Sequence, residues 1–166
     1  MEYCQLTPDL LPACHALFAD SIAALPDDDY PLTARLAWAG VWDEDVRHDW
    51  EARLAAAWSV AAMQEGTLLG FAWLSRDGEF DMLYVAPLAQ GQGLAQAMMQ
   101  QLEAQAAAAG VTALHAWASH AARPVFEKQG YRMLRPNRVS RDGCSLDNWL
   151  MAKGGWQEPL AGRSES

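Results

Sequence analysis

Cysteine is scarce in this chain and follows no pattern. The three cysteines, Cys4, Cys14 and Cys144, cannot all pair, and none stands in a CxxC or Cys/His spacing that binds metal. The N-terminus carries neither a basic region nor an apolar signal core. We therefore expect reduced thiols, a cytoplasmic protein and no metal site.

Long apolar runs and clustered positive charge are also missing. No apolar run approaches the ~20 residues of a membrane span, so we expect no membrane partner. The formal net charge is −9 and there is no run of Lys or Arg, which argues against nucleic acid as a partner. A negative field favours a cationic substrate such as an amine, although the same charge serves solubility equally well.

What remains is the composition of one globular domain. The chain has 166 residues, of which 51% are hydrophobic and 20% charged, enough for a single core without disulfides. We expect this domain to cover residues 1–153. The tail at 154–166 contains Gly, Pro, Ser and charged residues, and is predicted to be flexible.

Hydrophobic periodicity predicts a helical N-terminal part, an antiparallel meander and then alternating strands and helices. Along the strand Glu79–Val85, alternation would put Glu79, Asp81, Leu83 and Val85 on one face of the sheet. The order of elements indicates one mixed α/β domain. The predicted strands cover 2–6, 58–63, 67–74, 79–85, 113–118, 131–140 and 145–152. One predicted helix begins near Asp9, and the other predicted helices cover 32–39, 45–57, 94–109 and 123–129.

The sharpest signal lies between Tyr84 and Ala95, where a strand ends, two glycines follow and a helix begins. Backbone amides and the positive end of the helix dipole converge there, which suits a phosphate or pyrophosphate. A Walker loop is excluded because its lysine is absent, and a Rossmann fingerprint because the third glycine is missing. A purely structural glycine turn stays open as the alternative.

Three segments, taken in order, identify a family. Gln90, Gly93 and Ala95 match Gln/Arg-x-x-Gly-x-Gly/Ala, the segment 118–131 is similar to Ala-Ser…Phe-x-x-x-Gly-Phe, and 139–153 is similar to the ending of a branch of small bacterial members. The sequence thereby resembles the GCN5-related N-acetyltransferase (GNAT) superfamily from about residue 58 to residue 153.

The resemblance implies the GNAT fold, a mixed α/β domain with a central twisted, mostly antiparallel sheet of 6–7 strands flanked by about four helices. It implies an N-acetyltransferase that uses acetyl-CoA as cofactor and transfers the acetyl group directly to a primary amine in a ternary complex. The implied cofactor-binding residues are Leu83, Tyr84, Val85, Gln90, Gly91, Gln92, Gly93, Leu94, Ala95, Ser119, Arg123, Phe126 and Lys128.

Direct transfer needs a base, because an alkylammonium has a pKa of about 10.4 and is therefore protonated at neutral pH. Glu79 and Asp81 are the candidates by their position before the glycine loop. Phe126 stands where many family members have a tyrosine that protonates the leaving thiolate, so Ser119, Tyr131 or water would substitute for it. The predicted substrate-binding residues are Tyr30, Trp38, Asp81 and Asn148.

Two other functions stay open from the sequence. One is a non-catalytic acyl-CoA-binding or sensor module, which the missing tyrosine would fit. The other is an acyltransferase that acts on a peptide or protein amine. The sequence also leaves open the acceptor, the acyl-chain preference and whether the chain forms a homodimer.

Overall fold

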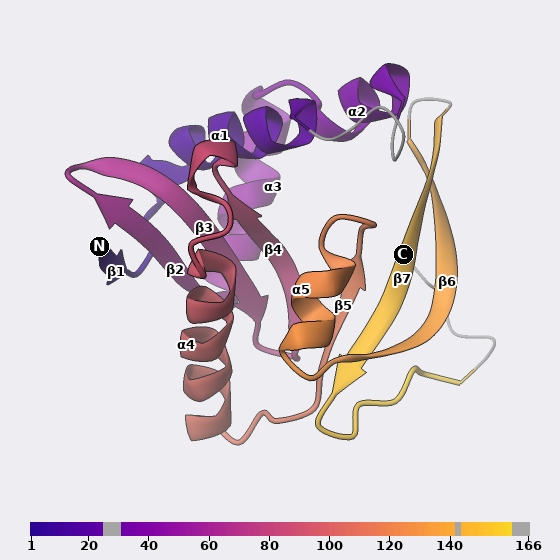
Figure 1. The fold of residues 1–166 in the computed structure, drawn as a ribbon. Coiled ribbons are helices and arrows are strands. Elements are labelled where there is room, and N and C mark those ends of the chain that lie inside the picture. The colour runs from indigo at the N-terminus through magenta and orange to yellow at the C-terminus, as the bar shows by residue number, and fades with distance from the viewer. Residues whose placement is uncertain (25–30, 142–143, 161–166) are drawn as a thin grey trace.

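The computed structural model describes residues 1–24, 31–141 and 144–160 and shows one seven-stranded sheet in the order β1-β2-β3-β4-β5-β7-β6 (Figure 1). Every neighbouring pair is antiparallel except β4 and β5, which run parallel. The predicted mixed α/β fold with a mostly antiparallel sheet of 6–7 strands is confirmed. The strands are β1 (Glu2–Cys4), β2 (Ala57–Gln64), β3 (Thr67–Ser75), β4 (Glu79–Val85), β5 (Leu114–Ala118), β6 (Arg132–Arg141) and β7 (Cys144–Lys153).

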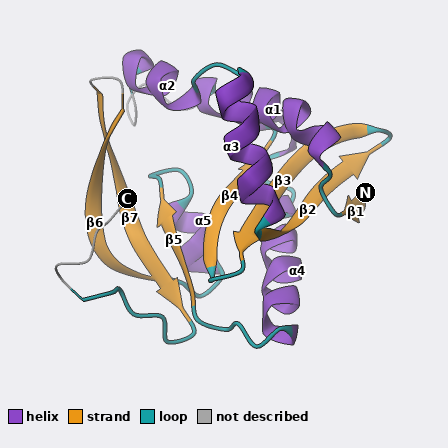
Figure 2. Cartoon of the chain, turned by 180° about the vertical axis from the view of Figure 1, so that it is seen from behind, coloured by secondary structure: helices purple, strands orange, loops and turns teal. Residues whose placement is uncertain are grey.

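Helices cover both faces of the sheet. Figure 2 shows α3 in front of the sheet, while α4 and α5 lie behind it. Among the described residues no helix combines the length and the apolar character needed to cross a membrane. The helices are α1 (Leu11–Ala23), α2 (Leu32–Ala39), α3 (Glu44–Ala55), α4 (Leu94–Ala108) and α5 (Arg123–Lys128), with two 3-10 turns, η1 (Pro8–Leu10) and η2 (Pro87–Ala89).

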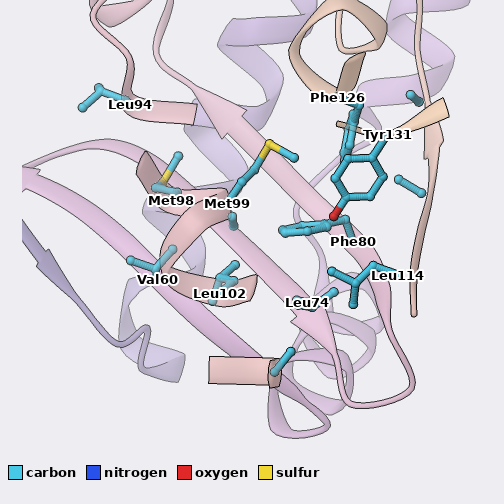
Figure 3. Close-up of a cluster of buried hydrophobic side chains, with 14 of the residues drawn as sticks. Val60, Leu74, Phe80, Leu94, Met98, Met99, Leu102, Leu114, Phe126 and Tyr131 are labelled. Atoms are coloured by element: carbon cyan, nitrogen blue, oxygen red, sulfur yellow. The ribbon is translucent and has the colours of Figure 1, made fainter. Parts of the chain in front are cut away.

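The sheet separates two hydrophobic cores. The α4-side core contains Met98 and Leu102 of α4 together with the rings of Phe80, Phe126 and Tyr131 (Figure 3). The α1-side core, on the other face, is rich in aromatic rings from α1, α3 and β3; it includes Phe18, Trp50, Phe71 and Trp73. β2 and β3 contribute residues to both cores, so the middle of these two strands is buried on both faces.

A β-bulge in β4 changes which side chains share a face. Trp73 pairs with Met82 and Leu74 pairs with Phe80, which leaves Asp81 as the extra residue of β4. A bulge interrupts the two-residue alternation, so Phe80 joins the α4-side core while Met82 joins the α1-side core. The predicted strict alternation along Glu79–Val85 is therefore wrong, because it assumed an unbroken strand.

His15 of α1 is buried among aromatic rings of the α1-side core. Its ring centroid lies 5.3 Å from that of Trp42 and 5.2 Å from that of Trp50. Burial lowers the pKa of His15, and a backbone hydrogen bond with Ala39 and the charge of Asp43 oppose this shift only in part. The folded protein therefore holds His15 in its neutral form more strongly than the unfolded chain does.

The lowered pKa of His15 predicts that stability falls as the pH is lowered from 7 to 5. The contribution of neutral His15 is complete above the unfolded-state pKa of about 6.5 and is lost as the pH falls below it, because the unfolded chain then binds the extra proton. Urea unfolding at both pH values measures this. His15→Phe should lose less stability between pH 7 and 5 than the wild type, whereas the exposed control His48→Gln should follow the wild type.

Candidate active site

A cleft of about 530 Å³ opens where β4 and β5 separate. These two strands, both fully described, pair only at Glu79–His115 and Phe80–Ala116, and then diverge (Figure 1). The residues that line the cleft come from α1, β4, the loop before α4, the first turn of α4, the turn into α5 and α5 itself. They are Ser21, Ile22, Leu83, Tyr84, Val85, Ala89, Gln90, Gly91, Gly93, Leu94, Ala95, Gln96, Ser119, Ala121, Ala122, Val125 and Lys128.

One wall of the cleft is a strand edge. The Ala86 amide donates to the Leu69 carbonyl at 2.8 Å, and hydrogen-bonded residues alternate along an antiparallel pair. The bonds from β4 to β3 therefore belong to Tyr84 and Ala86, while the N–H and C=O groups of Leu83 and Val85 point toward the diverging β5. This edge presents the backbone groups of Leu83 and the Val85 amide to an extended ligand, as a partner strand would require. The Val85 carbonyl already accepts from Ser21 Oγ at 3.1 Å and from Gln90 Nε2 at 3.4 Å.

The loop before α4 forms the end wall of the cleft. Gly91 and Gly93 have φ angles of 82° and 79°, a left-handed conformation that glycine adopts without strain. Gly93 is the N-cap of α4 and makes no side-chain cap, and the first turn of α4 carries no acidic residue. The first amides of a helix have no partner within it, so the start of α4 is suited to bind an anion.

Most of the predicted cofactor-binding residues meet in this cleft. Ser119 lines it, and its Oγ accepts a hydrogen bond from the Ala122 amide at 3.2 Å. Three predicted residues are absent from the lining. Gln92 sits between the two loop glycines, the Arg123 guanidinium lies 5.3 Å from the ring centroid of Trp149, and Phe126 is buried in the α4-side core.

Ser21 of α1 is a cleft residue that the sequence analysis missed. Its Oγ lies 2.8 Å from the Leu17 carbonyl oxygen and 3.1 Å from the Val85 carbonyl oxygen. The side chain therefore reaches across from α1 to the strand edge of β4. The available signal was a serine on the apolar side of a helix, but no local pattern says which strand such a serine contacts.

Asp81 is held by three hydrogen bonds. Its carboxylate accepts from Nε and Nη2 of Arg53 at 2.8 and 2.7 Å, and from the indole Nε1 of Trp73 at 2.7 Å. The paired contacts with Arg53 tie α3 to β4, and the Asp81 side chain is only 21% exposed. Asp81 does not line the cleft, and its oxygens are already engaged in holding α3 on the sheet.

Replacing Asp81 with asparagine should lower the free energy of unfolding by about 1–2 kcal/mol, because Arg53 and Trp73 lose their charged acceptor in a half-buried site. Urea unfolding measures the change. The matched control is Asp49→Asn, which removes the exposed partner of Arg53 on the same helix and should cost less than about 0.5 kcal/mol. Equal losses in the two variants would contradict this structural role.

Glu79 and Tyr131, two further predicted catalytic residues, have different surroundings. Glu79 Oε1 lies 3.4 Å from Nε2 of His115, and the Glu79 side chain is 36% exposed. The Tyr131 hydroxyl donates to Glu103 at 2.6 Å, and burial together with Glu103 raises the pKa of Tyr131. Neither residue lines the cleft. Tyr131 belongs to the α4-side core, whereas Glu79 keeps a partly exposed carboxylate at the closed end of the β4–β5 split.

Of the predicted substrate-binding residues besides Asp81, the structure describes the side chain of Asn148. Its Oδ1 accepts a hydrogen bond from Nδ2 of Asn137 at 3.0 Å, across the β6–β7 pair. Tyr30 and the side chain of Trp38 lie outside the described residues.

Comparison with known proteins agrees with this geometry. The acetyltransferase (GNAT) domain matches residues 36–151, well over half of the chain. The chain belongs to the GNAT acetyltransferase family. The resemblance, the fold and the identification as an acetyltransferase are thus confirmed at the level of the family.

Solved structures of GNAT proteins superpose over most of the chain. A GCN5-related N-acetyltransferase from Rhodopseudomonas palustris is 33% identical, with a TM-score of 0.84 over 92% of this chain and 94% of that one. A ribosomal-protein-alanine N-acetyltransferase from Brucella melitensis is 24% identical, with a TM-score of 0.70 over 92% and 99%. A phosphinothricin acetyltransferase from Sinorhizobium meliloti, solved with acetyl-CoA, is 16% identical, with a TM-score of 0.69 over 97% and 94%. A search of curated proteins found no match.

Proposed function

We propose that this GNAT protein is an acetyl-CoA-dependent N-acetyltransferase that transfers the acetyl group directly to a primary amine in a ternary complex. The observation that carries the proposal is one cleft that joins a strand edge at Leu83 and Val85 to the amide-rich start of α4. The free thiols of Cys4 and Cys14 fit the cytoplasmic location that we also propose.

The cleft fits acetyl-CoA in shape and in chemistry. The amides of a pantetheine arm match the outward-pointing N–H and C=O of Leu83 and the N–H of Val85. The loop around Gly91 and Gly93 offers amides for a pyrophosphate, and Lys128 adds a positive charge to the lining. When bound, acetyl-CoA would supply a thioester carbon to the incoming amine. The residues of the chain would bind the two molecules and transfer the protons.

We assign the uptake of the amine proton to Glu79 rather than Asp81. Asp81 already accepts three hydrogen bonds, whereas Glu79 keeps a partly exposed carboxylate next to His115. Glu79 stands four residues before Leu83, about 13 Å along a strand that rises ~3.3 Å per residue, so the proton would travel through water. Glu79→Gln should then lower the rate most at low pH, where few amines are already deprotonated.

Ser119 is the cleft residue best placed to assist the leaving thiolate. Its Oγ accepts from the Ala122 amide, which leaves the hydroxyl hydrogen available to donate into the cleft. A thiol with a pKa of about 8.5 leaves without much help, so this contribution is small. Tyr131 is not given this role, because its hydroxyl is committed to Glu103.

The release of free thiol from acetyl-CoA in the presence of primary amines tests the proposed function. Thiol release that depends on the amine, and an acetylated amine found by mass spectrometry, would support direct transfer. Binding of acetyl-CoA without release on small amines or on peptide N-termini would instead favour a non-catalytic acyl-CoA-binding module. The Phe126 ring stands in place of the family's tyrosine and is buried in the α4-side core. The absence of this tyrosine would fit a non-catalytic module.

A further inference from the structure

The chain continues past β7 and returns to the sheet. Gly154 makes this turn with a φ angle of 71°, and a Cβ built on it would lie 1.8 Å from the Thr112 carbonyl oxygen, so only glycine fits there. Two residues further on, the Trp156 ring stacks on His115, with ring centroids 4.1 Å apart and an interplanar angle of 18°. Residues 154–158, here named the C-terminal segment, are thus fixed against β5 as soon as the last strand ends.

A second contact fixes the other end of the C-terminal segment. The Glu158 carboxylate accepts from Nε of Arg135 in β6 at 2.8 Å, and both oxygens are engaged by the same guanidinium. The guanidinium lies 5.3 Å from the ring centroid of Trp117 in β5. The C-terminal segment therefore bridges β5 and β6, two strands that are separated by β7 in the sheet.

The C-terminal segment lies on the face that carries Glu79. Leu114 and Ala116 of β5 are buried in the α4-side core, so His115, which alternates with them, points to the opposite face. On that face Glu79 Oε1 approaches Nε2 of His115 to 3.4 Å. Trp156, His115 and Glu79 consequently form a row that begins at the C-terminal segment and ends at the closed end of the β4–β5 split.

The surroundings of the two ring nitrogens of His115 indicate how this row works. Its Nδ1 is buried and has no hydrogen-bond partner among the described residues, and its side chain is only 12% exposed. A buried N–H without an acceptor is costly, so the ring proton belongs on Nε2, where it faces the Glu79 carboxylate. His115 then directs one oxygen of Glu79 and leaves the other free to accept a proton.

We propose that the C-terminal segment completes the acceptor side of the active site: Trp156 positions His115, and His115 aligns the Glu79 carboxylate that takes the proton of the acceptor amine. This inference rests on the proposed function and deepens it. Trp156 and His115 are positioning residues. The acceptor class follows from the same row, because a carboxylate beside indole and imidazole rings suits a primary ammonium on an aromatic or apolar body.

The step balances without any further reactant. The ammonium gives one proton to Glu79 through water, and the neutral amine nitrogen forms a bond to the acetyl carbon. The C–S bond breaks with its electron pair on sulfur, and the amide nitrogen loses its second proton to solvent. The thiolate takes a proton from water or from Ser119, which regains one from water, and Glu79 returns its own proton to solvent.

The test uses the full-length protein, acetyl-CoA and 2-phenylethylamine as the probe amine. Trp156→Ala should lower kcat/KM for the probe at least about tenfold, because His115 then no longer aligns the Glu79 carboxylate. Trp156→Phe, which keeps a ring over His115, should recover activity to within about threefold. The matched control is Gln157→Ala, an exposed neighbour in the same segment, which should behave as the wild type. Calorimetry with acetyl-CoA should give the same Kd, within about twofold, for all four proteins.

Each of the following outcomes would contradict one of the two proposals. A Trp156→Ala protein with wild-type kcat/KM would overturn the inference. So would a wild type that binds acetyl-CoA but releases no thiol with 2-phenylethylamine, since the row would then not face an amine site of this chemistry. A wild type that does not bind acetyl-CoA would overturn the proposed function itself. The calorimetric titration detects this outcome independently of the thiol-release assay.

Discussion

Replacing Gly93 with valine is expected to raise the Kd for acetyl-CoA about 100-fold, which corresponds to a loss of about 2.7 kcal/mol. Gly93 caps α4 with a φ angle of 79°, and a β-branched residue in this left-handed conformation is strained by about 1–3 kcal/mol. The loop would relax to another conformation and withdraw the amides that we assign to the pyrophosphate. Calorimetric titration with acetyl-CoA measures the effect.

The opposite end of the same helix provides a matched control. Gly110, just beyond α4, has a φ angle of 85°, and a Cβ built on either Gly93 or Gly110 would meet nothing within 4 Å. Gly110→Val therefore introduces the same strain in the same open space, but away from the cleft lining. It should lower stability while the Kd for acetyl-CoA stays within about twofold of the wild type. Equal weakening of binding by both variants would mean that α4 stability, rather than the loop, governs binding.

Replacing Glu103 with alanine is expected to lower the free energy of unfolding by about 3 kcal/mol. The Glu103 carboxylate accepts from Gln129 at 3.2 Å, from Tyr131 at 2.6 Å and from Lys153 at 3.0 Å, and so joins α4 to β7 and to the turn after α5. The Glu103 side chain is 15% exposed. Its removal leaves the Tyr131 hydroxyl without its acceptor and takes the counter-charge from Lys153, whose Nζ then keeps the Gln129 carbonyl at 2.7 Å. Urea unfolding measures the loss.

Two companion variants separate this network from catalysis. Gln100→Ala, at an exposed position of the same helix, should change stability by less than about 0.5 kcal/mol. Tyr131→Phe removes one hydrogen bond and should cost about 1 kcal/mol while leaving kcat unchanged. A Tyr131→Phe protein of wild-type stability with a large loss of kcat would show that the tyrosine acts in the reaction after all.

The sequence was sufficient to predict the features that depend on neighbouring residues. β4 and α2 have the predicted bounds, and α4 differs by one residue at its end. Gly91 and Gly93 take the left-handed conformation that the strand–glycine–helix pattern requires. These features are set by local preferences, so a short stretch of sequence contains the information that determines them.

The features that the sequence left out depend on contacts between distant segments. The bulge at Asp81 is set by pairing with β3, and it moves Asp81 into the hydrogen bonds with Arg53 and Trp73. Trp156 follows a glycine-rich turn and has no periodicity, yet it stacks on His115, 41 positions earlier in the chain (156 − 115). Neither contact leaves a repeating pattern in the sequence, which is why the predicted roles of the two carboxylates could not be separated before the fold was known.

Titration of acetyl-CoA into the wild-type protein by calorimetry tests the central claim most directly, because the cleft between β4 and β5 is argued from geometry to be the site of this molecule. The account predicts binding with a micromolar Kd, about −8 kcal/mol, at one site per chain. The absence of binding at millimolar acetyl-CoA would contradict it, and the loop at Gly91 and Gly93 would then be a structural turn only.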